Sequence, residues 1–160
     1  MKRTGILLLL LPLLAPAITA GAGEAVTVPE EVVEISEELG GEYGICPELI
    51  QAVCWQESRF HADAENGGCV GIMQVSPQWH RERMERLGVT DLTDVRQNMA
   101  VAVDYLAELA AEYEDVGAAL MKYNGDGRLG KLLEGDMGDV SDYAQTVLEL
   151  SAELERRHGK

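Results

Sequence analysis

Glu57, in the stretch "AVCWQESRF", has a position that is unusual for an acidic residue. On a helix over residues 47–60, with about 100° per residue, it shares an arc of about 140° with apolar side chains. These are Leu49, Ile50, Val53, Cys54 and Phe60. Because an ionised carboxylate is costly to bury, four roles are open: an ion pair with Arg59 or another base, a metal ligand, a solvent-facing helix end, or an acid kept protonated for catalysis.

The histidine spacing gives a metal-binding role little support. His61, His80 and His158 form no paired ligand spacing, and the sequence has no calcium-loop pattern. We therefore expect neither a metal site nor a cofactor. A carboxyl group in apolar surroundings keeps its proton to a higher pH, and a glycosidase uses such an acid to protonate a leaving oxygen.

Two downstream segments carry groups that suit a sugar ligand. In "GIMQV", Gly71 lets the chain pass close to a ligand or a neighbouring segment, and Gln74 offers an amide that both donates and accepts. In "LMKYNGDG", Tyr123 and Asn124 place a flat ring and a second amide at a helix end. Amides with aromatic rings favour a neutral ligand rich in hydroxyl and acetamido groups.

Four motifs follow one another in the chain: "ESRF", "GIMQVSP", "KYNG" and "DYAQTVL". In order and separation they resemble the lytic transglycosylase domain of the lysozyme-like superfamily, over roughly residues 43–150. The family pattern is Glu-Ser, Gly-x-x-Gln, Ala-Tyr-Asn and a Tyr near the start of the last helix. Lys122 stands where the family has alanine, and Gly125 and Asp126 also depart from its "AYNAG" pattern.

The resemblance implies roles for seven residues. Glu57 is the single catalytic acid and base, and Tyr143 approaches its carboxyl group. The residues implied in substrate binding are Ser58, Met73, Gln74, Tyr123, Asn124 and Tyr143. Structural roles stay open as well: Tyr143 and Met73 as core residues, and Gln74 and Asn124 as caps of local backbone. Trp55 and Trp79 are weaker candidates for sugar stacking.

The implied reaction is non-hydrolytic cleavage of the β-1,4 bond between N-acetylmuramic acid (MurNAc) and N-acetylglucosamine in peptidoglycan. It leaves 1,6-anhydro-MurNAc ends, because the C6 hydroxyl of the substrate replaces water as nucleophile. One alternative is a lysozyme-type muramidase that uses Glu57 with a second acid, for which Asp63, Glu65 and Asp104 are available. Another is a non-catalytic wall-binding or secretion-apparatus scaffold.

Hydrophobic periodicity and helix-end signals predict a mainly α fold. We expect a single lysozyme-like domain of the goose-type or SLT kind, with five to six helices and at most a small β element near residues 68–75. The expected helices cover residues 29–40, 47–59, 77–88, 94–114, 116–124 and 143–157. The glycine-rich residues 125–139 indicate a surface loop or a broken helix.

The N-terminus has the pattern of a secretory signal peptide, with a basic start, a short apolar run and small residues. The expected organisation is a signal peptide at 1–22, a segment with a short helix at 23–42 and a catalytic domain at 43–157. We expect a secreted, cell-wall-associated monomer without stable membrane insertion; anchoring by an uncleaved signal is the alternative. With 13 basic and 28 acidic residues, the chain is a poor partner for nucleic acid.

Three cysteines lie in the part expected to be exported, where disulfides persist. Cys46 and Cys54 are separated by roughly 12 Å along one helix, which is too far for a disulfide. A bridge must therefore use Cys69. We expect Cys46 as its partner, because Cys54 lies within the apolar arc, although three free thiols remain an alternative.

Overall fold

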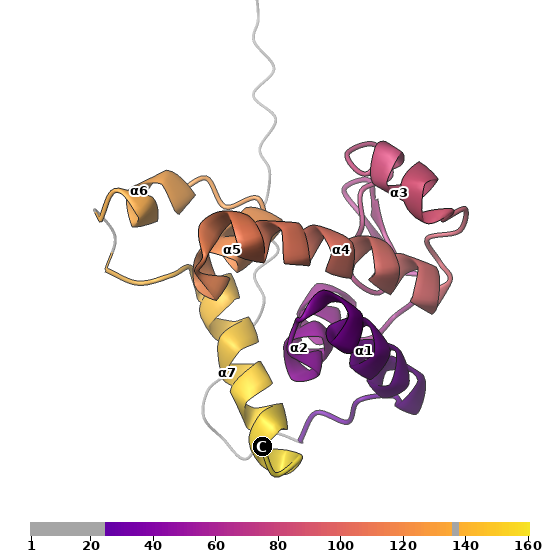
Figure 1. Ribbon diagram of the computed structural model, residues 1–160, viewed down its shortest axis with the longest axis horizontal. Coiled ribbons are helices and arrows are strands. Elements are labelled where there is room, and N and C mark those ends of the chain that lie inside the picture. Colours follow the sequence, from indigo (N-terminus) through magenta and orange to yellow (C-terminus); the bar gives the residue numbers. More distant parts are fainter. Residues whose placement is uncertain (1–24, 136–137) are drawn as a thin grey trace, which may run out of the picture.

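A computed structural model describes residues 25–135 and 138–160 (Figure 1). Within them lie seven helices and one antiparallel two-stranded sheet. The elements are α1 Glu30–Tyr43, α2 Pro47–Ser58, β1 Glu65–Asn66, β2 Cys69–Val70, α3 Arg81–Leu87, α4 Val95–Tyr113, α5 Val116–Tyr123, α6 Leu129–Leu133 and α7 Asp142–Arg157. The mainly helical fold class is confirmed. The count exceeds the expected five to six because the glycine-rich segment forms the short helix α6.

Polar side chains cap three of the helices. Asp94, Asp115 and Ser141 each accept a hydrogen bond from the backbone N–H three residues later, at the starts of α4, α5 and α7. These bonds satisfy N–H groups that have no partner inside the helix. Pro47 begins α2, where its missing N–H costs nothing. The predicted starts of α2, α4 and α5 are therefore confirmed.

Two predicted helix ends are wrong. α1 continues through Gly40 and Gly41 to Tyr43, and Gly44, with φ of 69°, ends it. Gly40 instead lets the segment at Ile45 pack closely against α1, because a Cβ at this position would lie 2.6 Å from the carbonyl oxygen of Ile45. The second wrong prediction is the start of α3, which begins at Arg81 rather than at Pro77 because the preceding residues form turns.

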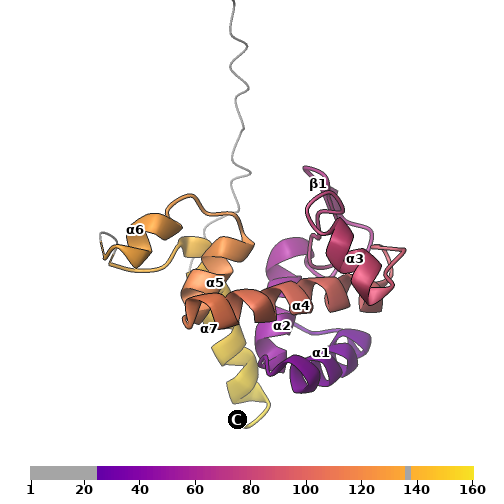
Figure 2. The same cartoon turned by 45° about the horizontal axis from the view of Figure 1, so that its top comes forward.

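The helices pack around one core (Figures 1 and 2). α4 crosses the middle of the molecule and α1 lies below it in both views, while α2 lies beside α1 in Figure 1 and passes behind α4 in Figure 2. α2 packs against α1 and α7, while α4 packs against α1, α3 and α5. This arrangement brings the C-terminal end of α2, the sheet, α5 and the start of α7 together. No helix in residues 25–135 or 138–160 combines the length and apolarity that a membrane crossing needs. The predicted signal peptide, 1–22, lies outside the described residues.

The predicted disulfide between Cys46 and Cys69 is wrong for this structure, in which the three cysteines are free. Cys46 precedes α2, and its thiol donates to Glu48 Oε2 at 3.2 Å. Cys69 lies in β2, near the opposite end of α2, where Ser58 bonds to the segment that follows β2. The length of α2, roughly 18 Å for its residues, therefore lies between the two thiols.

Glu48 is a buried acid that the sequence patterns did not single out. Its side chain is 1% exposed, and Oε1 accepts hydrogen bonds from Lys160 Nζ at 2.7 Å and His158 Nδ1 at 2.9 Å. Burial raises the pKa of Glu48, but the bonds from Lys160, His158 and Cys46 outweigh it and lower the pKa to about 2. This cluster attaches the end of α7 to the start of α2.

We expect Glu48→Gln to lower the free energy of unfolding at pH 7 by about 2–3 kcal/mol, because buried charge-assisted bonds are lost. The folded pKa of about 2 lies below the ordinary value of 4.5. The contribution of Glu48 is therefore complete above about pH 4.5 and is lost as the pH falls through about 2. Urea unfolding at pH 7 and at about pH 3 measures it.

Glu153→Gln is the control, because Glu153 is exposed on α7. The role of Glu48 would be contradicted if both variants lost the same free energy of unfolding, or if the difference between parent and Glu48→Gln grew at low pH.

Candidate functional site

Glu57 lies in the last turn of α2, and its carboxyl group is largely buried. Tyr143 Oη, at the start of α7, donates a hydrogen bond to Glu57 Oε1 at 2.5 Å. Burial raises the pKa of Glu57, and the bond from Tyr143 lowers it by a smaller amount. The structure thus places a carboxyl group with a raised pKa beside a single phenol donor.

The surroundings of Glu57 do not suit three of its possible roles, namely a partner in an ion pair, a metal ligand and a solvent-facing residue at a helix end. Arg59 lies over the ring of Trp55, 4.5 Å from its centroid, and donates to the Trp55 carbonyl. Among the described residues no ion pair involves Glu57. The same residues contain no cluster of three or more His, Cys, Asp or Glu suited to a metal ion. The burial of Glu57 therefore favours a protonated acid.

The segment at residues 70–75, here called the site loop, is held by a buried amide. Asn98, on α4, donates from Nδ2 to the carbonyl oxygens of Val70 and Leu92 at 2.8 and 2.9 Å. Its Oδ1 accepts from the N–H of Met73 at 2.9 Å. Gly71 has φ of 83°, and a Cβ there would lie 2.1 Å from Asn98 Nδ2. Only glycine fits this approach without displacement.

Asn98 was missed in the sequence, although a signal was present. It lies one helical turn before Ala102 on the apolar stripe of α4, so an amide stands at a core position. A buried amide needs hydrogen-bond partners, and two of its three partners lie in the site loop.

Ser58 and Met73 support the site loop from behind. Ser58 is buried, and its Oγ donates to the carbonyl of Ile72 at 2.7 Å, which attaches α2 to the loop. The Met73 side chain is 0% exposed, while its carbonyl accepts a hydrogen bond from Tyr123 Oη at 2.8 Å. Their parts in substrate binding stay predictions, and direct contact by the buried Met73 side chain would require the loop to move.

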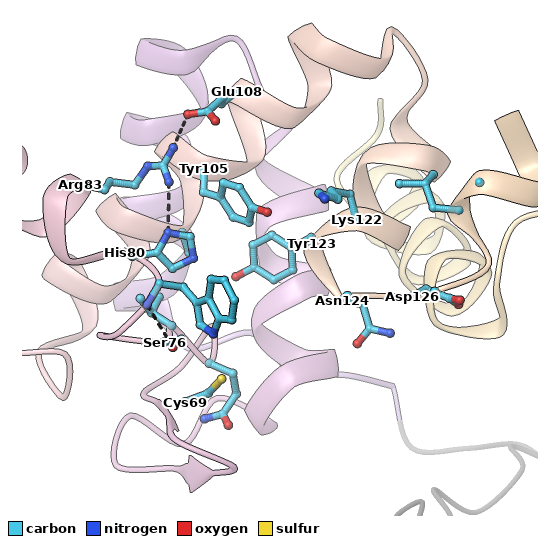
Figure 3. Close-up of a pocket in the computed structure, with 18 of the residues that line it drawn as sticks. Cys69, Ser76, His80, Arg83, Tyr105, Glu108, Lys122, Tyr123, Asn124 and Asp126 are labelled. Carbon is cyan, nitrogen blue, oxygen red and sulfur yellow. Dashed lines mark hydrogen bonds and ion pairs between the residues drawn. The ribbon is translucent and has the colours of Figure 1, made fainter.

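Gln74, Tyr123 and Asn124 line one pocket of about 1030 Å³ (Figure 3). Gln74 Nε2 donates to the carbonyls of Ala64 and Gly71, which leaves its amide oxygen without a bond among the described residues. Burial and the nearby Glu57 raise the pKa of Tyr123 well above its usual value, so its hydroxyl stays protonated. Asn124 ends α5 and is exposed. Glu57 itself is not among the residues that line this pocket, but its charge acts on Tyr123, which is.

Aromatic rings continue along the wall of this pocket. The ring of Tyr105, on α4, lies 4.6 Å from His80 and 5.8 Å from Tyr123, measured between centroids. Trp79 also lines the pocket and is 84% exposed. His80 and Tyr105 were missed in the sequence; an aromatic residue off the apolar stripe of α4 was the available signal for Tyr105. The row offers flat apolar faces of the kind that sugars bind.

Charged side chains near the pocket are mostly paired. Asp104 accepts hydrogen bonds from Arg83 at 2.6 Å and from Arg86 at 2.7 Å, and Arg83 also pairs with Glu108. The arginines lower the pKa of Asp104 although burial raises it. Asp104 is therefore a structural anion rather than a second catalytic acid. Asp63 and Glu65, the remaining candidates for a second acid, are not buried near Glu57: Asp63 lies in a turn and Glu65 is exposed in β1.

Comparison with known proteins gives matches of three kinds, to a family model, to a curated protein and to solved structures. The model of the transglycosylase SLT domain matches residues 34–139. The membrane-bound lytic murein transglycosylase F of Desulfosudis oleivorans is 36% identical over 81 residues, which are 50% of this chain and 17% of that protein. An X-ray structure of an inactive mutant of lytic transglycosylase Slt from Pseudomonas aeruginosa has a TM-score of 0.70 and 22% identity, covering 82% of this chain and 25% of that one. This chain thus spans a quarter or less of either relative, and the Slt structure confirms the lysozyme-like fold.

We expect Gly71→Ala to lower the free energy of unfolding by about 3–5 kcal/mol, because its Cβ would collide with Asn98 in a left-handed backbone conformation. Gly68→Ala is a matched control, since Gly68 has φ of 87° and a Cβ there would meet no atom within 4 Å. It should cost only about 1–2 kcal/mol. Urea unfolding compares the two; similar losses would mean that the contact with Asn98 is unimportant.

Proposed function

The chain belongs to the transglycosylase SLT domain family, and we propose that it is a peptidoglycan lytic transglycosylase with Glu57 as its single acid and base. The observation that carries the proposal is the Glu57 carboxyl group, which is buried, free of ion pairs in the described residues and bonded to Tyr143. The murein transglycosylase named above supports the substrate class. Glycan strands of peptidoglycan are the proposed partner, and no cofactor is needed.

The proposed reaction balances with one carboxyl group. Protonated Glu57 gives its proton to the glycosidic oxygen, and the bond from C1 of MurNAc to that oxygen breaks. The C6 hydroxyl of the same MurNAc then attacks C1, and the Glu57 carboxylate takes the hydroxyl proton. The enzyme returns to its starting state and the product carries a 1,6-anhydro ring. A nucleophile within the substrate is already at high effective concentration, so a positioned acid is sufficient.

The surrounding residues have distinct proposed parts. Tyr143 orients the Glu57 carboxyl group through its hydrogen bond. Gln74, Tyr123 and Asn124 contact the sugars from the pocket wall. Ser58 and Met73 act on the substrate through the site loop, for which their bonds to Ile72 and Tyr123 are the support.

Two alternatives are less well supported. A muramidase would need a second carboxylate to activate water, whereas Asp104 is held by two arginines. A non-catalytic wall-binding or secretion-apparatus scaffold would have no need to bury an acid at the groove, because burial destabilises an ionisable group. We further propose that the protein is secreted to the cell wall as a monomer; retention by an uncleaved signal peptide is the alternative.

Digestion of purified glycan strands, followed by mass spectrometry of the products, tests this proposal. We expect 1,6-anhydro products, lighter by one water than the products of hydrolysis. Glu57→Gln should lower the rate by about 10²- to 10⁴-fold, because an amide cannot deliver the proton. Glu65→Gln, at an exposed position in β1, is the matched control and should cleave at the parent rate.

Hydrated products would favour the muramidase. Undiminished cleavage by Glu57→Gln would exclude Glu57 as the acid, and binding without cleavage by both parent and variant would favour the scaffold.

A further inference from the structure

Lys122 is a cation in the wall of the pocket. It lies in the last turn of α5, directly before Tyr123 and Asn124, and it lines the same pocket as they do. Figure 3 shows its side chain beside Tyr105 and Tyr123. The position is occupied by alanine in the family pattern, so the cation is a feature of this chain.

Arg83, the other Lys or Arg side chain that lines the pocket, is already paired, and so is the nearby Arg128. Arg83 binds Asp104 and Glu108, and Arg128 binds Asp126 at 2.8 Å. These two pairs also occupy Glu108 and Asp126, the acids of the pocket wall. Lys122 takes part in no ion pair among the residues that the structure describes. Its charge is therefore available to a ligand.

The negative charge of the whole chain makes a cation in the pocket important for the binding of anionic ligands. With a formal net charge of −15, the protein repels anionic ligands at long range. Peptide-bearing strands carry several free carboxylates on each peptide, whereas a strand freed of peptide by an amidase keeps one lactyl carboxylate on each MurNAc. An unassisted pocket would therefore favour the less charged strand without peptides. A lysine beside the sugar contacts offsets this repulsion at one point.

We propose that Lys122 binds a carboxylate of the peptide attached to the glycan strand and gives the enzyme a preference for peptide-bearing strands. The proposal rests on the proposed function and adds to it the chemical class of the substituent that the pocket recognises. Two neighbouring side chains fit an amphipathic peptide as well. Trp79 and Leu133 line the pocket and are 84% and 58% exposed, which gives the peptide an apolar contact.

The test compares parent, Lys122→Gln and Lys131→Gln on two substrates. One is purified glycan strands with their peptides, and the other is the same strands after an amidase has removed the peptides. The readout is the ratio of kcat/KM on the first substrate to kcat/KM on the second. We expect Lys122→Gln to lower this ratio by about three- to tenfold, as for loss of one partly exposed ion pair.

Lys131→Gln is the matched control, because Lys131 is exposed on α6 and lies outside the pocket lining. It should leave the ratio unchanged. An unchanged ratio for Lys122→Gln, or equal losses for both variants, would overturn the proposal. Binding of both substrates to Glu57→Gln, with and without Lys122→Gln, separates it from the proposed function. If the parent protein cleaves neither substrate, the proposed function is wrong. The ratio of the two dissociation constants then tests the Lys122 proposal by itself, which is overturned if Lys122→Gln leaves that ratio unchanged.

Discussion

The hydrogen bonds of Asn98 are the interaction on which the site depends. One buried amide binds three backbone groups, two in the site loop and one at Leu92, and it can do so only because Gly71 leaves room for it. The fixed loop then joins two further elements, since Ser58 binds it from α2 and Tyr123 binds the Met73 carbonyl from α5. Helix α2, which carries Glu57, helix α5, which carries Tyr123, and the long helix α4 are therefore all bonded to one loop, and a shift of the loop would affect all three.

Two acids on α2 show how surroundings decide protonation. Glu48 and Glu57 both lose solvent, and burial raises the pKa of each. Glu48 has Lys160 and His158 as partners, and these hold it as a carboxylate. Within residues 25–135 and 138–160, Glu57 has only the neutral phenol of Tyr143 as a hydrogen-bond partner, so burial prevails and its pKa stays raised. One acid therefore stabilises the fold as a carboxylate, whereas the other has the raised pKa that the proposed catalytic acid needs.

Local patterns predicted the features that depend on neighbouring residues. The starts of α2 and α5 follow from Pro47 and from the apolar pattern of residues 116–124, and the apolar neighbours of Glu57 on α2 follow from helical spacing. The partners of Asn98 and Glu48 could not be predicted in this way. Asn98 meets a loop 25 or more residues away and Glu48 meets residues 110 and 112 positions away, so only the packed helices bring them together. The expected disulfide failed for the same reason, because spacing along one helix says nothing about where a distant strand will lie.

The central proposal is that burial raises the pKa of Glu57 so that it can act as the acid, with Tyr143 as its one hydrogen-bond donor among the described residues. The pH dependence of kcat/KM for glycan-strand cleavage, compared between parent and Tyr143→Phe, tests it most directly. We predict that the parent rate falls as the pH rises through the pKa of Glu57. Because the bond from Tyr143 lowers that pKa, its loss should move the fall to higher pH. A fall that stays in place, or moves to lower pH, would contradict the claim.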